Sequence, residues 1–246
     1  MLSKNFRVCD IFARAESYCN EVEKNLVPPE ALLAMMKRKS LEVTTFGGGA
    51  LSPFYTKNED FNLVPGPAGA SDIYICDVST LNMYRLMSMT VPFEYLGQLP
   101  TSEDGNYRDM ESREGFQRAW RSSEWQNTRC YYLQLGNDTP ELYVRIPSNL
   151  TIALDKVTLT YKRLPDMSYT LEDVRDVNTN IYADIPDFFI THWELGLAVD
   201  ALKQAGMKAT DARMGGLIED QKAVTQALSR ELQGDMAALK GQNKDH

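Results

Sequence analysis

The amino-acid sequence predicts an α+β fold, in which a helical bundle carries a β-rich insertion of short antiparallel strands. Three observations lead to this prediction. Near the N-terminus apolar residues recur at steps of three and four, which is the period of a helix. From Ile73 to about Tyr161, β-branched and aromatic residues dominate. At 186–205 the sequence is apolar on nearly every helical face, which predicts a core helix that is buried from most sides.

The chain has 246 residues, of which 43% are hydrophobic and 24% charged, so it can bury a full core as one domain or two small ones. We expect a helical bundle domain at 1–40 and 184–215, a β-rich insertion at 41–165, a connector at 166–183 and a C-terminal arm at 216–246. No run approaches the roughly 20 apolar residues of a membrane span, and charges scattered near the start argue against a secretory signal. The sequence therefore predicts a soluble chain with a cytosolic start and no membrane contact.

Two helices are predicted at the N-terminus. The first, at about 5–25, has one apolar stripe, formed by Val8, Phe12, Ala15, Cys19, Val22 and Leu26. Two prolines end it, and Pro29 suits the first position of a second helix that runs to Lys39. We expect the two helices to form a hairpin. The sequence LEVTTF that follows, with three glycines after it, favours strand and loop.

The middle of the chain contains five apolar runs that predict strands: IYICDV, YRLMSMTVPFEYL, CYYLQLG, ELYVRI and KVTLTYKRL. The turn residues at 136–140 link two alternating runs and predict a β-hairpin. One helix is expected to interrupt this region, from Glu111 to Trp125.

The core helix has clear end signals. Pro186 suits its first position, and Gly206 is a natural C-terminal cap. Its large aromatic side chains are expected to anchor the core: Phe188, Phe189 and Trp193. Beyond Gly206 the sequence predicts a long helical arm. Its apolar residues form a stripe too narrow for a core and suited to docking in a groove, and they are Val224, Leu228, Leu232, Met236 and Leu239.

The sequence offers little material for catalysis. Its two histidines, His192 and His246, are too few for a triad or a multi-histidine metal site, and His192 in an apolar helix is typical of a core residue bonded to a neighbour. The glycines at 47–49 lack the Lys-Ser/Thr that completes a phosphate-binding loop. The four cysteines form no C-x-x-C pair, which predicts buried free thiols. We expect no enzyme activity, no cofactor and no metal.

Two features leave other interpretations open. Adjacent acidic pairs, among them Glu59/Asp60 and Glu172/Asp173, are the residue type of a carboxylate-based glycan hydrolase, but the sequence does not place two carboxylates across a cleft. The aromatic and basic cluster at 115–132 is suited to stacking single-stranded bases. Its interleaved glutamates and the net charge of −8 favour packing or a subunit contact instead.

Taken in order, these pieces resemble the head-to-tail adaptor (connector) proteins of tailed bacteriophages. In that family a run Y-x-L-x-G, L-x-(I/V)-x-P and L-x-(I/V)-x-Y-x-x-x-P precedes (I/M)-P-x-x-(F/Y), which opens a core helix. The resemblance is closest from Tyr131 to Gly206, and the stretch at about 94–129 departs from the shorter adaptors. The family's places can be filled here by Tyr132, Leu133, Leu135, Gly136, Leu142, Val144, Pro147, Val157, Leu159, Tyr161, Pro165, Ile185, Pro186, Phe188 and Phe189.

The resemblance implies a structural virion protein made in the host cytoplasm. It implies a homo-oligomeric ring in the neck, usually of twelve copies, which docks on the portal protein and joins it to a tail or nozzle protein. DNA would pass through the lumen without sequence-specific binding, and a net charge of −8 suits such passage because like charges repel. C-terminal arms of the family commonly engage the portal, so the stripe at 224–239 is our candidate for portal contact. Another virion protein, such as a tail-tube or head-completion subunit, is the alternative.

Overall fold

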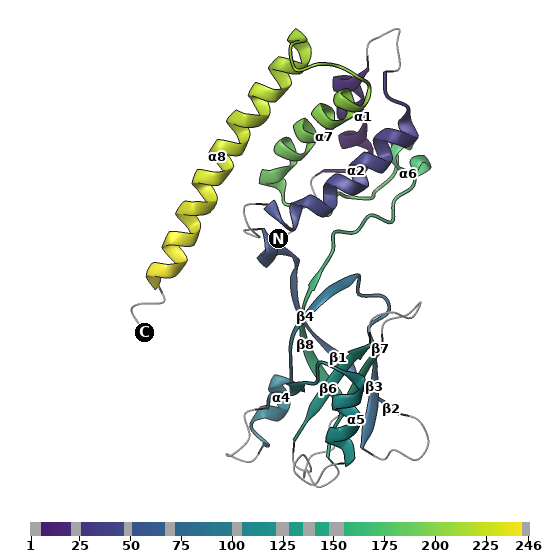
Figure 1. Cartoon of the computed structure of the whole chain (residues 1–246), viewed down its shortest axis with the longest axis vertical. Coiled ribbons are helices and arrows are strands. Elements are labelled where there is room, and N and C mark those ends of the chain that lie inside the picture. The colour runs from purple at the N-terminus through teal and green to yellow at the C-terminus, as the bar shows by residue number, and fades with distance from the viewer. Residues whose placement is uncertain are drawn as a thin grey trace. The chain divides into compact units, whose positions relative to one another are not determined.

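The computed structural model divides the chain into two compact units (Figure 1). The helical unit combines Met1–Tyr55 with Pro165–His246, and the strand unit is Thr56–Leu164. The described core residues fall into separate clusters for the two units. The structure describes residues 6–20, 26–46, 51–66, 72–99, 105–121, 128–134, 141–147 and 155–242, with the backbone alone at 119–121 and 233–242.

In the helical unit, one helix, α7, contacts α1, α2 and α8. Most of its residues are buried, which agrees with the predicted core helix. The elements of this unit are α1 (Val8–Cys19), α2 (Pro29–Val43), α6 (Leu171–Arg175), α7 (Ile190–Gln204) and α8 (Ala212–Gln242), with 3-10 turns at Ser52–Tyr55 and Asp187–Phe189.

The N-terminal helices follow the prediction in part. The described members of the α1 stripe Val8, Phe12, Ala15 and Cys19 are buried, whereas the end of the predicted helix, at 21–25, lies outside the described residues. A strand was predicted from Leu41, and this is wrong at 41–43 because α2 continues to Val43. The glycines predicted as a loop, at 47–49, lie outside the described residues. Val43 is only 1% exposed in the helical core, so burial of this helix face outweighs the local strand preference.

The segment predicted as a polar connector contains the short helix α6. The Thr170 side chain accepts a hydrogen bond from the Asp173 backbone, and the Asp173 side chain accepts one from the Thr170 backbone, which makes a capping box. Tyr169 and Val174 are buried in the core of the helical unit. The segment is therefore packed into this unit.

Helix α7 ends where the sequence predicts. Gly206 has a φ of +86°, a conformation that glycine adopts without strain. Its N–H donates to the Lys203 carbonyl, and the Met207 N–H donates to the Leu202 carbonyl, both at 3.0 Å. These two bonds form a Schellman motif, so the predicted C-terminal cap is confirmed.

The strand unit contains two sheets. The three-stranded sheet has the order β1-β8-β4, and the second sheet has the order β2-β3-β7-β6-β5. All pairs are antiparallel except β5–β6, which is parallel. The elements are β1 (Thr56–Asn62), β2 (Val64–Pro65), β3 (Ile73–Asp77), β4 (Met83–Thr90), α4 (Phe93–Leu96), β5 (Arg108–Asp109), α5 (Arg113–Arg121), β6 (Cys130–Gln134), β7 (Glu141–Arg145) and β8 (Lys156–Arg163).

The two sheets enclose one core and are joined at both sides. Only Leu63 separates β1 of one sheet from β2 of the other. On the other side, the Tyr107 N–H donates to the Met89 carbonyl and the Val91 N–H to the Gly105 carbonyl. Residues from both sheets share the core, including Cys76, Met89, Tyr131, Leu142, Val144, Val157, Leu159 and Tyr161. The two sheets of the strand unit are therefore packed together around this shared core.

These sheets show that the predicted fold class is wrong. The chain is a mixed α/β protein, 46% helical and 24% strand, with a five-stranded mixed sheet, and not a helical bundle with an insertion of short antiparallel strands. The sequence pattern missed β1 because its residues, TKNEDFN, are polar apart from Phe61 and mostly exposed. Backbone pairing with β8 along its whole length holds this strand in the sheet.

Several predicted elements of the strand unit are present. The run from Tyr84 to Leu96 was predicted as a strand, and it forms one, β4, as far as Thr90. The prediction is wrong at its end, where Phe93–Leu96 form the short helix α4. The predicted helix at 111–125 is observed as α5, with 122–125 outside the described residues. Strands β6 and β7 pair antiparallel, as the predicted hairpin requires, and the turn residues 136–140 lie outside the described part.

Candidate functional site

The three aromatic residues predicted as core anchors occupy different environments. Phe189 and Trp193 are 3% and 1% exposed, whereas Phe188 is 38% exposed and lies against Phe54, with ring centroids 5.5 Å apart. The Phe189 ring packs edge-on against Phe46 at 4.7 Å. Two of the three residues therefore lie in the core of the helical unit, and Phe188 lies at its surface.

His192 joins α7 to α8. Its Nδ1 atom lies 3.0 Å from Oγ1 of Thr225, and the Thr225 hydroxyl also donates to the Gln221 carbonyl at 2.7 Å. Because that hydroxyl proton is already used, the imidazole Nδ1–H is the donor to Thr225. Its ring packs against Phe46 and Phe189. Burial, aided by the charge of Lys39, lowers the pKa of His192, so a neutral ring is favoured.

Two ion pairs fix α7 against the N-terminal helices. Arg14 of α1 donates to Oε1 of the buried Glu194 from Nε at 3.0 Å and from Nη2 at 2.6 Å. Burial raises the pKa of Glu194, although Arg14 acts in the opposite direction. Lys39 of α2 contacts Asp200 at 3.0 Å. Both acidic groups on α7 therefore have a partner on a neighbouring helix.

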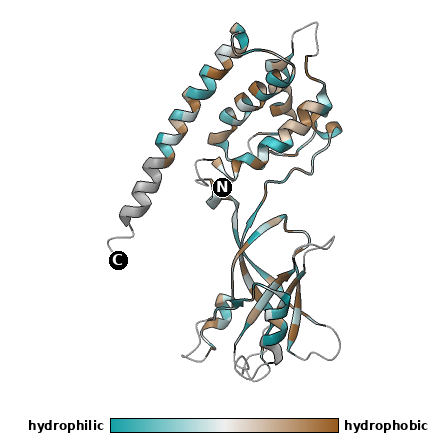
Figure 2. Ribbon diagram, viewed as in Figure 1, coloured by the Kyte–Doolittle hydropathy of each residue, from teal (hydrophilic) through white to brown (hydrophobic). Residues whose placement is uncertain are grey.

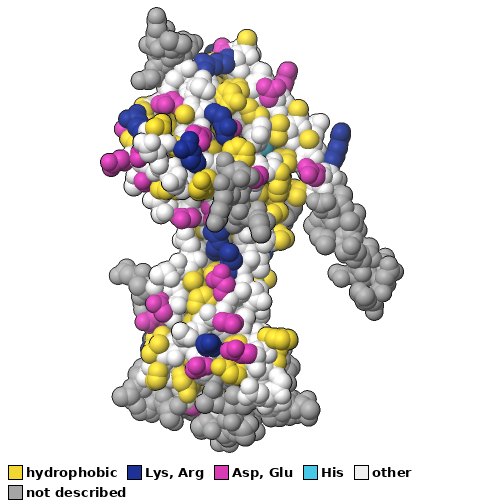
Figure 3. All heavy atoms as spheres, turned by 180° about the vertical axis from the view of Figure 1, so that it is seen from behind, with side chains coloured by type: hydrophobic (Ala, Val, Ile, Leu, Met, Phe, Trp, Pro, Cys, Tyr) yellow, Lys and Arg dark blue, Asp and Glu magenta, His cyan; other side chains and the backbone are white. Residues whose placement is uncertain are grey.

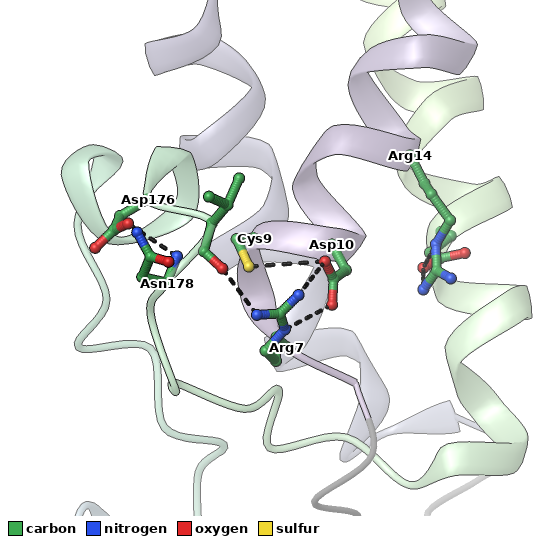
Figure 4. A network of polar contacts seen from close by, with 8 residues as sticks. Arg7, Cys9, Asp10, Arg14, Asp176 and Asn178 are labelled. Carbon is green, nitrogen blue, oxygen red and sulfur yellow. Dashed lines mark hydrogen bonds and ion pairs between the residues drawn. The ribbon is translucent and has the colours of Figure 1, made fainter.

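A polar network holds the start of α1 to the segment after α6 (Figure 4). Arg7 binds both carboxylate oxygens of Asp10, from Nε and Nη2, at 2.9 Å each. Its Nη1 donates to the Val177 carbonyl at 2.8 Å. The hydrogen bonds from Arg7 lower the pKa of Asp10. All three Arg7 bonds are made to this chain, so this network stabilises the fold.

The apolar stripe predicted for portal contact is partly occupied by the chain itself. Leu228 is 5% exposed and belongs to the helical core, and Val224 and Leu232 pack against that core. The side chains of Met236 and Leu239 lie outside the described residues. Along the part of α8 coloured in Figure 2, hydrophobic residues are interspersed with hydrophilic ones, as on a helix with one packed face.

Several members of the acidic pairs accept hydrogen bonds within their own units. Glu59 and Asp60 of β1 accept from Tyr161 and Thr158 of β8. Glu172 and Asp173 lie in the first turn of α6, where acidic side chains complement the helix dipole. The Glu103/Asp104 pair lies outside the described residues.

The aromatic and basic cluster at 115–132 contributes to packing. Phe116 and Cys130 are buried with Ile73 in a small core, and the Tyr132 ring lies 6.4 Å from that of Phe116. Arg129 is also buried. Residues 122–127 of the cluster lie outside the described part.

The four cysteines are free and buried, as predicted. Burial raises the pKa of Cys19 and of Cys130 to about 11, so both are thiols near neutral pH. Among the residues that the structure describes, no group of three or more His, Cys, Asp or Glu side chains is placed to hold a metal ion. No described helix is both long enough and apolar enough to cross a membrane.

Sequence reasoning missed one exposed surface, on β4. The β4–β8 register shifts between Met83 and Arg85 and again between Leu86 and Ser88, which leaves Tyr84 and Met87 without an opposite residue. Both are exposed, at 41% and 45%. The sequence shows an apolar run there, but the register shifts arise from pairing with a strand about 70 residues away and have no local signal.

Comparison of the sequence with protein-family models gave no match, and comparison with the curated proteins gave none.

Proposed function

We propose that this chain is the head-to-tail adaptor of a tailed bacteriophage, a structural subunit whose ring docks on the portal and joins it to the tail. One observation carries the proposal: most residues of the adaptor pattern are buried and form the frame of both units. The buried members are Leu142, Val144, Pro147, Val157, Leu159, Tyr161, Pro165, Ile185, Pro186 and Phe189.

These residues also occupy consecutive elements in the order of the family pattern. Leu142 and Val144 lie in β7, and Val157, Leu159 and Tyr161 lie in β8, where they face the core of the strand unit. Pro165 is the first residue of the second segment of the helical unit, and Pro186 directly precedes the turn that leads into α7. The pattern therefore specifies architecture, which is what a structural virion protein requires of its sequence.

The proposed portal contact is the part of α8 beyond Leu232. The helix continues from there to Gln242, about 15 Å further at the usual rise per residue. Val224, Leu228 and Leu232 pack on this chain's own core, so they hold the helix in place. Of the portal-contact candidates, Met236 and Leu239 lie in the proposed contact segment.

The lumen is proposed to be lined by acidic side chains that do not retain DNA. The net charge of −8 per subunit supports this, because the charge repeats around a ring. Among the described residues on the face shown in Figure 3, acidic and basic side chains are interspersed, unlike the uniform basic patch of a nucleic-acid-binding surface.

A truncation of α8 tests the proposal. Ending the chain after Leu232 retains every described side-chain contact of α8, so the subunit is expected to remain folded while its attachment to portal-containing heads is lost. The matched control ends after Gln242 and is expected to attach normally. Attachment is measured by co-sedimentation with heads, and negative-stain images of the bound complex are expected to show a ring. Undiminished attachment of the shorter chain would contradict the proposed contact, and a bound protein without a ring would contradict the adaptor assignment.

A further inference from the structure

On strand β4, the side chains of Tyr84 and Met87 are exposed at two positions where its pairing with β8 is interrupted. Two β-bulges, at Tyr84 and Met87, interrupt its pairing with β8. Bulges re-aim side chains and prevent another strand from pairing along the edge. The aromatic ring and the thioether are both exposed, and tyrosine and methionine are enriched in protein interfaces. This edge is therefore suited to a side-chain contact with a protein partner.

The positive charges beside Tyr84 and Met87 favour an acidic partner. Arg85 of β4 lies directly opposite Lys162 of β8 in the register. Like charges in opposite positions of a sheet destabilise it. Within the described residues, neither cation has a hydrogen bond or an ion pair. An acidic group docked beside Tyr84 and Met87 would relieve this repulsion.

The opposite edge of the same sheet carries acidic groups. Strand β1 pairs with β8 in one unbroken register and presents Glu59 and Asp60 at its surface. Tyr161 and Thr158 of β8 donate to these carboxylates and orient them. Lys57 lies 4.0 Å from Glu59 and offsets only part of the negative charge. The two edges of one sheet are therefore complementary in charge.

We infer that the β4 edge of one copy, formed by Tyr84, Arg85 and Met87, docks on the acidic β1 edge of the next copy. The contact joins two different surfaces, so it repeats head to tail and produces a ring where the rotation between copies closes. This inference rests on the proposed function, because it assigns the subunit contact of the proposed ring. Tyr84 and Met87 supply its apolar centre, and Arg85 meets Asp60 at its rim.

Charge reversal on the two edges tests the contact. Arg85→Glu places an acid opposite the acidic β1 edge, and Asp60→Lys places a base opposite the basic β4 edge. Each single variant is expected to require about a tenfold or higher protein concentration for assembly. An equimolar mixture of the two is expected to assemble, because each edge of one variant is then opposite in charge to the edge of the other variant on which it docks. Arg118→Glu on the exposed face of α5 is the control and is expected to assemble like the wild type.

Assembly is measured by sedimentation velocity over a concentration series at low and high salt, with and without the portal protein, after thermal denaturation has shown that the variants are folded. If both single variants assemble like the wild type, the inference is wrong while the proposed ring stands. If the mixture stays dissociated, the β4 edge binds something other than β1 of a neighbour, which equally overturns the inference. A wild type that forms no oligomer alone or on the portal overturns the inference and the ring together. Loss of attachment after truncation at Leu232 is measured separately and bears on the portal contact alone.

Discussion

At the scale of single residues, α7 carries two side chains with different roles. Trp193 fills space in the core, and His192 makes a hydrogen bond to Thr225. Trp193→Ala removes a side chain that is 1% exposed and is expected to lower the free energy of unfolding by about 3–5 kcal/mol. His192→Gln retains an amide that can donate to Thr225 and is expected to cost about 1 kcal/mol or less. Urea denaturation measures both. A folded His192→Gln subunit that fails to attach to heads would assign His192 a functional role.

The same histidine gives the subunit a pH dependence. Burial and Lys39 lower the pKa of His192 below its ordinary value of 6.5, whereas Glu42, the other titratable group beside it, acts to raise it. As the pH falls below 6.5, the unfolded chain takes up this proton before the folded one. Its contribution to stability is therefore complete above pH 6.5 and is lost as the pH falls towards the folded pKa.

The urea midpoint of the wild type is expected to fall more than that of His192→Gln between about pH 7.5 and about pH 5.5. Glu194, whose pKa is raised by burial, titrates in both proteins, so the difference between them isolates the histidine. Equal decreases in the two proteins would show that the His192 pKa does not change on folding.

At the scale of elements, the sequence predicted those whose apolar pattern is local and strong. The stripe of α1 and the alternating runs of β7 and β8 each bury one face, and each was predicted from periodicity. Strand β1 has no such face, and the end of α2 is held by packing of Val43 in the core. Helix α6 carried a readable signal in its capping box, Thr170 to Asp173, which a search for apolar runs overlooks.

The candidate site, too, could be predicted from the sequence only in part. The stripe on α8 is visible in the sequence, but whether Leu228 faces this chain or a partner depends on where α7 lies. The Arg14–Glu194 pair joins residues 180 positions apart and has no local pattern. The bulges that expose Tyr84 and Met87 are likewise a product of strand pairing. Periodicity therefore found the helix and the strands, and tertiary pairing decided which of their faces remain exposed.

Packing of α8 on the helical core leads to a prediction for Leu228. Leu228→Ala is expected to lower the free energy of unfolding of the isolated subunit by about 2–4 kcal/mol, because a buried leucine is replaced by a cavity. Lys222→Ala, an exposed change on the same helix, is the control and is expected to leave stability nearly unchanged. Urea denaturation in the absence of any partner is the measurement. A fully stable Leu228→Ala subunit with impaired portal binding would show that this side chain faces the partner.

At the scale of the whole molecule, the chain enters and leaves the strand unit at neighbouring positions. Thr56 and Lys162 are paired residues in β1 and β8, so their Cα atoms lie about 5 Å apart. The described cores of the two units share no residue. The sequence predicted that the helical part is assembled from both ends of the chain, but it understated the strand unit, whose core is enclosed by two joined sheets.

A chain in which a short Gly/Ser linker replaces residues 57–161 is therefore expected to fold as the helical unit, with a single cooperative thermal transition and native helix content by circular dichroism. If the two contacts proposed above are separate, this chain retains portal binding through α8 beyond Leu232 and loses assembly between copies, because both sheet edges are removed. Shortening it further, after Leu232, is expected to abolish portal binding as well. Assembly of the linker chain into rings on the portal would place the subunit contact in the helical unit and contradict the role of the β1 and β4 edges.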